Sequence, residues 1–117
     1  MGLLSKVFGG RPAEAVVTHA VGDAVRVLPG VTGHTITYNH QQYQGGALSG
    51  VVDVADSPTF LEVLRTSRGI LGEVLGADAD RVVFYLSGRT PDGAAVQPGD
   101  LGLSQPPSGR EVADRLT

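Results

Sequence analysis

The side chains in this sequence that can transfer a proton are few and widely spaced. The candidates for general acid–base chemistry are His19, His34, His40, Asp53 and Glu62. Catalytic proton transfer needs two such groups at close range, and no spacing in the sequence brings any two of them together. The sequence motifs of nucleophile elbows, zinc proteases and nucleotide-binding loops are also missing. We therefore predict no catalytic residues.

Metal and cofactor chemistry is not indicated either. The chain has no cysteine, which excludes disulfides, thiolate zinc sites and a cysteine nucleophile. Asp78 and Asp80 alternate in a loop, and Asp56 precedes a helix start, whereas a calcium loop needs about six oxygen ligands. We interpret the first two residues as part of a solvated turn and Asp56 as a helix cap. No metal and no cofactor is expected.

The most unusual polar segment is a loop flanked by two tyrosines. Tyrosine and amide side chains are typical of adaptable binding surfaces, and loops on a rigid scaffold often carry function. An ordinary hairpin with a polar tip and a cross-strand tyrosine pair is the structural alternative. The binding residues predicted in this loop are Tyr38, Asn39, His40, Gln42 and Tyr43.

A second candidate surface is a helix face that contains glycine. Gly69 and Gly72 fall on one side of a predicted helix, roughly in line with Arg65, and these three residues are predicted to bind. A glycine inside a helix costs about 1 kcal/mol relative to alanine, so the pair should have a cause. One cause is close packing against another backbone, from the protein's own fold, a partner or a second copy. The alternative is glycine at an exposed position without any contact.

These residues need a scaffold, and its clearest element is one long helix. Pro58 stands where the first turn of a helix accepts proline, and Gly76 is a typical residue just beyond a helix end. Between them lies an apolar stripe at helical spacing, which includes Phe60 and Leu71. The pattern predicts a helix from about Pro58 to Leu75, whose apolar side must be buried against a sheet.

The chain before this helix predicts strands. Loose alternation over residues 14–21 and an apolar run over 24–28, joined at Gly22, predict a hairpin. Residues 34–38 alternate between apolar and polar side chains, and residues 48–55 form the next strand. Each of these segments is expected to pair antiparallel with its neighbour.

The chain after the helix predicts a final hairpin. Residues 81–87 carry apolar side chains on both faces, as a central strand does, and Thr90–Gly93 is a strong turn signal. Residues 94–97 return as a short strand. The expected fold is α+β with two layers, a mostly antiparallel sheet covered on one face by a single long helix. The other face of the sheet is then either solvated or covered by a partner.

Length and composition fit one domain with a short segment at each end. The 117 residues are 41% hydrophobic and 18% charged, which is typical of a globular domain. Residues 13–103 are predicted as the α+β domain. Residues 104–117 are predicted as a Pro-rich flexible tail, unless Val112 and Leu116 dock onto the domain.

Residues 1–12 are predicted as a short amphipathic leader. Its apolar face would allow weak contact with a membrane surface, docking to a partner or packing on its own domain, and a floppy terminus is the fourth alternative. The residues on that face are Leu3, Leu4, Val7 and Phe8.

Charge and hydropathy narrow the function classes. A net charge of −3 with scattered basic residues argues against nucleic-acid binding. The sequence has no long apolar span and no secretory signal, so we expect a cytoplasmic protein.

We predict a non-catalytic protein-interaction module that self-associates or serves as a subunit of a bacterial assembly. One alternative is a small-ligand-binding protein or enzyme with a pocket near the Tyr38–Tyr43 loop. A second alternative is an inhibitor or immunity-type protein whose acidic balance suits a basic partner.

Overall fold

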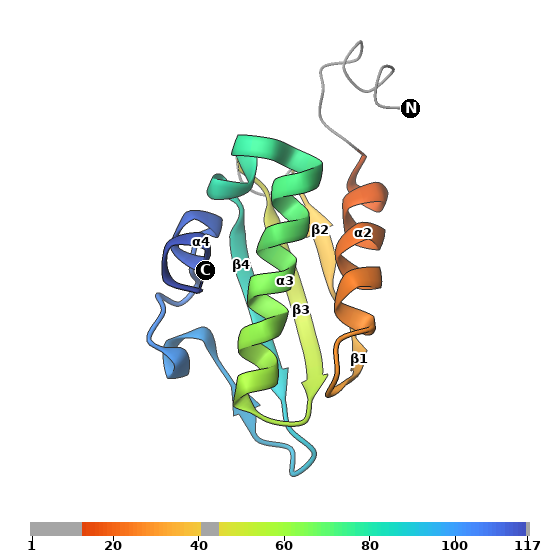
Figure 1. Ribbon diagram of the computed structural model, residues 1–117, viewed down its shortest axis with the longest axis vertical. Coiled ribbons are helices and arrows are strands. Elements are labelled where there is room, and N and C mark those ends of the chain that lie inside the picture. The colour runs from red at the N-terminus through yellow and green to blue at the C-terminus, as the bar shows by residue number, and fades with distance from the viewer. Residues whose placement is uncertain (1–12, 41–44, 117) are drawn as a thin grey trace.

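Figure 1 shows a computed structural model of the protein, which describes residues 13–40 and 45–116. The predicted leader and two residues of the polar loop, Gln42 and Tyr43, lie outside the described residues. The described elements, with η for a 3-10 helix, are α2 (Glu14–Arg26), β1 (Val31–His34), β2 (Thr37–Asn39), β3 (Ala47–Val54), α3 (Ser57–Leu75), η1 (Gly76–Arg81), β4 (Val83–Arg89), β5 (Ala95–Val96), η2 (Pro98–Leu101) and α4 (Gly109–Leu116).

A mixed five-stranded sheet forms one layer of the fold. β1 and β2 pair antiparallel with one side of β3, β4 pairs parallel with its other side, and β5 pairs antiparallel with β4. α3 links β3 to β4. A helix used as a crossover connection lets the second strand run in the same direction as the first. The predicted α+β class is confirmed, but the expectation of a mostly antiparallel sheet is wrong for its central pair.

The predicted first hairpin is also wrong, because residues 14–26 form helix α2. Its buried apolar side chains are Val17, Val21 and Val25, which are four positions apart and lie on one face of a helix. His19, which the strand interpretation grouped with the valines, is exposed. Burial of the valine stripe outweighs the slightly low helix propensity of β-branched residues.

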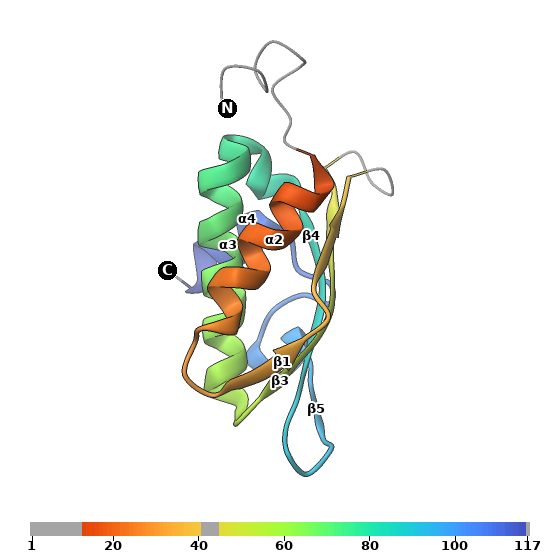
Figure 2. The ribbon, with the colours of Figure 1, turned by 90° about the vertical axis from the view of Figure 1, so that its right-hand side faces the viewer.

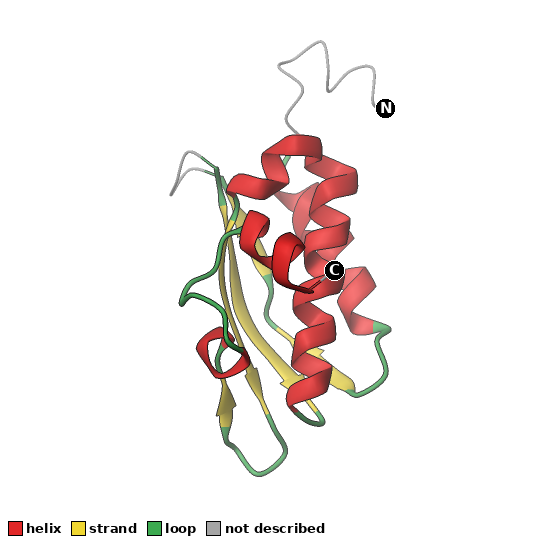
Figure 3. Ribbon diagram, turned by 60° about the vertical axis from the view of Figure 1, so that its left-hand side comes forward, coloured by secondary structure: helices red, strands yellow, loops and turns green. Residues whose placement is uncertain are grey.

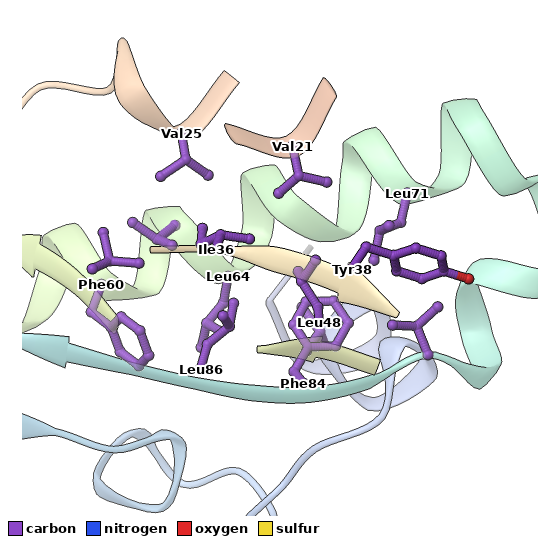
Figure 4. Packing of buried hydrophobic residues seen from close by; sticks show 14 of the residues in the cluster. Val21, Val25, Ile36, Tyr38, Leu48, Phe60, Leu64, Leu71, Phe84 and Leu86 are labelled. Carbon is purple, nitrogen blue, oxygen red and sulfur yellow. The ribbon is translucent and has the colours of Figure 1, made fainter. Parts of the chain in front are cut away.

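Helices cover one side of the sheet together. Figure 2 shows α2, α3 and α4 on the same side, which corrects the expectation of a single covering helix. The core lies between these helices and the strands. In Figure 4, Val21 and Phe60 from the helices point toward Leu48, Phe84 and the neighbouring strand side chains. Among the described residues, none of the helices is both long and apolar enough to cross a membrane.

The long helix is confirmed close to its predicted bounds. The Asp56 carboxylate accepts hydrogen bonds from the Thr59 backbone N–H (2.9 Å) and from its hydroxyl (2.6 Å), as a helix cap does. At the other end, Gly76 has φ +63°, a conformation that favours glycine. The side that faces the sheet buries Phe60 and Leu71.

The Asp56 cap gives a prediction for acid stability. The hydrogen bonds from the Thr59 hydroxyl and N–H hold the pKa of Asp56 below its usual value. This contribution to stability is therefore present above the unfolded-state pKa of about 3.9 and is lost as pH falls through the lower folded-state pKa. In Asp56→Asn, which still accepts a hydrogen bond, this acid-dependent part should be absent. Urea midpoints measured between about pH 6 and pH 2 should therefore converge toward low pH, and parallel profiles would contradict the assignment.

In the described part of the predicted tail, residues 104–116, the chain contacts the rest of the domain. Val112 of α4 is buried against α3 and η1. Arg68 of α3 donates a hydrogen bond from Nε to the Gly109 carbonyl (2.9 Å). Just before α4, the Pro107 carbonyl accepts a hydrogen bond from the Phe84 N–H (2.9 Å), which attaches the chain to β4.

Candidate functional site

The predicted polar loop lies only partly within the described residues. Tyr38 is buried and its ring is part of the core (Figure 4), which leaves it little surface for a ligand. Asn39 is exposed, and His40 is half-buried with Nδ1 at 3.8 Å from Oε2 of Glu14. Because residues 41–44 are not described, the binding role of this loop and a pocket beside it stay predictions.

The polar groups near this loop have a structural role that the sequence did not indicate. They accept hydrogen bonds from three backbone N–H groups along the outer edge of the β1–β2 chain. An edge strand normally presents such N–H groups unpaired, ready to pair with another chain. Here α2 and one histidine cover that edge. The three bonds run from Ile36 to Nδ1 of His34 (3.1 Å), from Tyr38 to Oγ1 of Thr18 (2.9 Å) and from His40 to Oε2 of Glu14 (2.9 Å).

The glycine-containing face of α3 has no close neighbour within the described part of the chain. A Cβ added at Gly69 would meet nothing within 4 Å, and one added at Gly72 would meet only the flexible end of Arg68. Packing against the protein's own described backbone is therefore not the cause of these glycines. Arg65 instead donates a hydrogen bond from Nε to the carbonyl of Leu116 (2.6 Å), at the end of α4. Binding at this face stays a prediction.

The candidate acid–base residues do not form one site. His19 lies on α2 and His34 at the end of β1. Asp53 pairs with Arg89 at 2.8 Å, and this hydrogen bond raises the pKa of the arginine above its usual value. Within residues 13–40 and 45–116, no three histidine or carboxylate side chains are placed to hold a metal ion.

The sheet face opposite the α-helices is partly exposed in the described structure, and we call it the open face. Figure 2 shows the α-helices on one side of the sheet only. Strand alternation and burial place ten side chains on the open face: Thr35, Thr37, Asn39, Ser49, Val51, Asp53, Val83, Tyr85, Ser87 and Arg89.

The middle of the open face is apolar and aromatic. Val51 is 37% exposed and Tyr85 is 41% exposed, and they lie on the adjacent strands β3 and β4. Thr37, Ser49 and Tyr85 stand opposite one another across three strands. Most of the surrounding side chains are small and carry hydroxyl groups. Such a surface can make apolar contacts and neutral hydrogen bonds.

Beside the open face, the outer edge of β4 has a gap in its pairing. On this side, the Phe84 N–H donates a hydrogen bond to the Pro107 carbonyl, and the Thr90 N–H donates one to the Ala94 carbonyl (both 2.9 Å). Backbone groups alternate sides along a strand, so the N–H and C=O of Leu86 point the same way. β5 pairs only with Gly88 and Arg89. Among the described residues, none bonds to the Leu86 backbone on this side.

A hollow of about 310 Å³ lies at this gap. The residues that line it come from β4, from the start of η2 with Gln97 before it, and from the segment that precedes α4. Figure 3 shows the backbone of these segments beside the sheet. The lining residues outside β4 are Gln97, Pro98, Gln105 and Pro106. The sequence offered no signal for this site, because the two prolines come from segments predicted as a strand end and as a tail.

Within the described residues, the fold is α+β with α-helices on one face of a mixed sheet. No protein-family model, no curated protein and no solved structure matches the chain.

Proposed function

We propose that the protein is a non-catalytic interaction module that self-associates through its open face. The observation that supports this is the partly exposed pair of Val51 and Tyr85 on the parallel strands β3 and β4. Parallel sheets are normally covered on both faces, and in the described part of the chain the α-helices cover only one face of the sheet that contains this parallel pair. Exposed tyrosine beside apolar side chains is also typical of protein interfaces.

The charge of the open face is compatible with a second copy of the chain as the occupant. The protein carries a net charge of −3, so two copies repel over most of their surfaces. Among the strand side chains of the open face, the charged ones are Asp53 and Arg89, which neutralise each other at 2.8 Å. Two copies can therefore meet through this face without like-charge repulsion. Association through the β1–β2 edge is disfavoured, because side chains already accept hydrogen bonds from three N–H groups of this edge.

Light scattering coupled to size-exclusion chromatography tests this proposal. Between about 1 and 200 μM, a range that covers micromolar dissociation constants, the molar mass should rise from 12.1 kDa toward twice that value. Tyr85→Lys and Val51→Lys should both stay at 12.1 kDa, because each places a cation on both sides of the contact. The matched control is Val16→Lys, at a valine that is 56% exposed on α2 and should leave association unchanged.

Two outcomes would overturn the proposal. One is a wild-type mass of 12.1 kDa at every concentration. The other is association that survives both open-face substitutions but disappears when Met1 to Gly10 are deleted, which would assign it to the predicted leader. Circular dichroism of each variant shows whether the fold is retained. A cytoplasmic location and the inhibitor or immunity-type alternative stay predictions.

A further inference from the structure

We infer that a second hollow, at one end of the open face, is a binding site for a free α-amino acid with an uncharged side chain. The hollow has a volume of about 460 Å³, which is within the range of small-molecule sites in proteins. It lies where the parallel strands β3 and β4 end and the turn toward β5 begins. Among the described residues, the charged side chains that line it are Asp53 and Arg89. The inference does not rest on self-association.

The two charged side chains stand next to each other and are accessible from solvent. Asp53 and Arg89 are partners in the register of β3 and β4, and Nε of Arg89 donates a hydrogen bond to Oδ1 of Asp53 (2.8 Å). Their neighbours in the same row of the sheet are Gly33 on β1 and Ala95 on β5. Because these neighbours have no side chain or only a methyl group, they leave the pair uncovered. The side chain of Arg89 is 58% exposed and that of Asp53 is 36% exposed.

Each member of the pair keeps hydrogen-bonding atoms for a ligand. Among the described side chains, the Arg89 guanidinium bonds only to Asp53 and only through Nε, so its two Nη groups are available as donors. Oδ2 of Asp53 is the acceptor that this hydrogen bond does not use. A Cβ added at Gly33 would stand 3.3 Å from Oδ2, so the glycine keeps the space beside this oxygen open.

The paired charges select a ligand that carries both signs. A simple anion at the guanidinium would be repelled by Asp53, and a simple cation at the carboxylate would be repelled by Arg89. An α-amino acid offers its carboxylate to the guanidinium and its ammonium group to the carboxylate, so both contacts are charge-assisted hydrogen bonds. The rest of the lining is uncharged and includes Val54 and Pro91. A charged ligand side chain would lose hydration there without gaining a partner.

An NMR titration with three related molecules tests the kind of ligand. L-leucine carries both charged groups, 4-methylpentanoate lacks the ammonium group, and 3-methylbutylamine lacks the carboxylate. L-leucine should shift the backbone amide resonances of Arg89 and Gly93, but not that of Gly69 on α3, with a dissociation constant of about 1 mM or lower. Each single-charge molecule should bind at least about tenfold more weakly. Equal binding of either one, or no shift with L-leucine at about 20 mM, would overturn the inference.

Substitution of the pair tests the residues. Asp53→Asn and Arg89→Gln should each weaken L-leucine binding at least about tenfold, because each leaves one charged group of the ligand without an opposite charge. The matched control is Asp23→Asn, which removes a similar exposed pair with Arg26 (2.7 Å) on α2 and should leave binding unchanged. Tyr85→Lys should also bind L-leucine as the wild type does, whichever oligomeric state light scattering finds. Unchanged binding in Asp53→Asn or Arg89→Gln, or an equal loss in Asp23→Asn, would overturn the inference.

Discussion

Replacing Phe60 by alanine is expected to lower the free energy of unfolding by about 3–5 kcal/mol. The Phe60 ring is fully buried and joins α3 to the sheet. It lies over β4 at Gly88, where an added Cβ would be 3.1 Å from the ring. Because glycine has no side chain to move into the space, truncation should leave a cavity that the surroundings cannot fill.

Urea denaturation of the purified variants measures this loss. The control is Val27→Ala, since Val27 is 76% exposed and its truncation should change the free energy of unfolding by less than about 0.5 kcal/mol. Both variants should keep the wild-type denaturant slope, because the surface exposed on unfolding hardly changes. A loss for Phe60→Ala within about 1 kcal/mol of the control would show that α3 does not rest on β4 in this way.

Replacing Gly109 by alanine should cost about 1–3 kcal/mol and displace the C-terminal helix. A Cβ at this position would overlap the Ala79 carbonyl oxygen, a backbone atom that cannot rotate away. The Gly109 N–H also donates a hydrogen bond to the Val82 carbonyl (2.7 Å), and its carbonyl accepts one from Arg68. Moving α4 to relieve the overlap breaks these bonds and exposes Val112.

Hydrogen exchange and limited proteolysis should locate the damage in α4. The amides of residues 109–116 are expected to lose protection in Gly109→Ala, while those of β3 keep it. The control is Gly69→Ala, where the added methyl meets nothing and should stabilise the helix by about 0.5–1 kcal/mol. Destabilisation of both variants to the same extent would contradict the role given to Gly109.

The sequence predicted α3 well because the signals of this helix are local. Its cap at Asp56 and its apolar stripe lie within the helix or next to it. α2 lacks such a start signal, since Ala13 before it makes no side-chain cap, and its valines also suit a strand. The parallel pairing of β3 with β4 and the docking of α4 depend on contacts between distant segments, which periodicity does not report.

The candidate site shows the same division between local and distant information. Because a single predicted helix could cover only one face of the sheet, the sequence predicted that the other face would be solvated or covered by a partner, and the described α-helices lie on one face. The gap at Leu86 was not predictable, because it exists only where Pro98 and Pro106 meet one strand from two directions. Tyr38 was chosen as a binding residue from its loop composition, yet its alternation with Thr37 already placed it on the buried side.

The hydrogen bonds between α2 and the outer strand edge have a consequence for the aggregation of the protein. A hydroxyl and a carboxylate, from Thr18 and Glu14, take the place that a neighbouring strand would occupy. If α2 were trimmed away or locally unfolded, the Tyr38 and His40 amides would lose these acceptors and become a template for cross-β stacking. We therefore expect α2 to protect this strand edge against fibril growth, in addition to its share of the core.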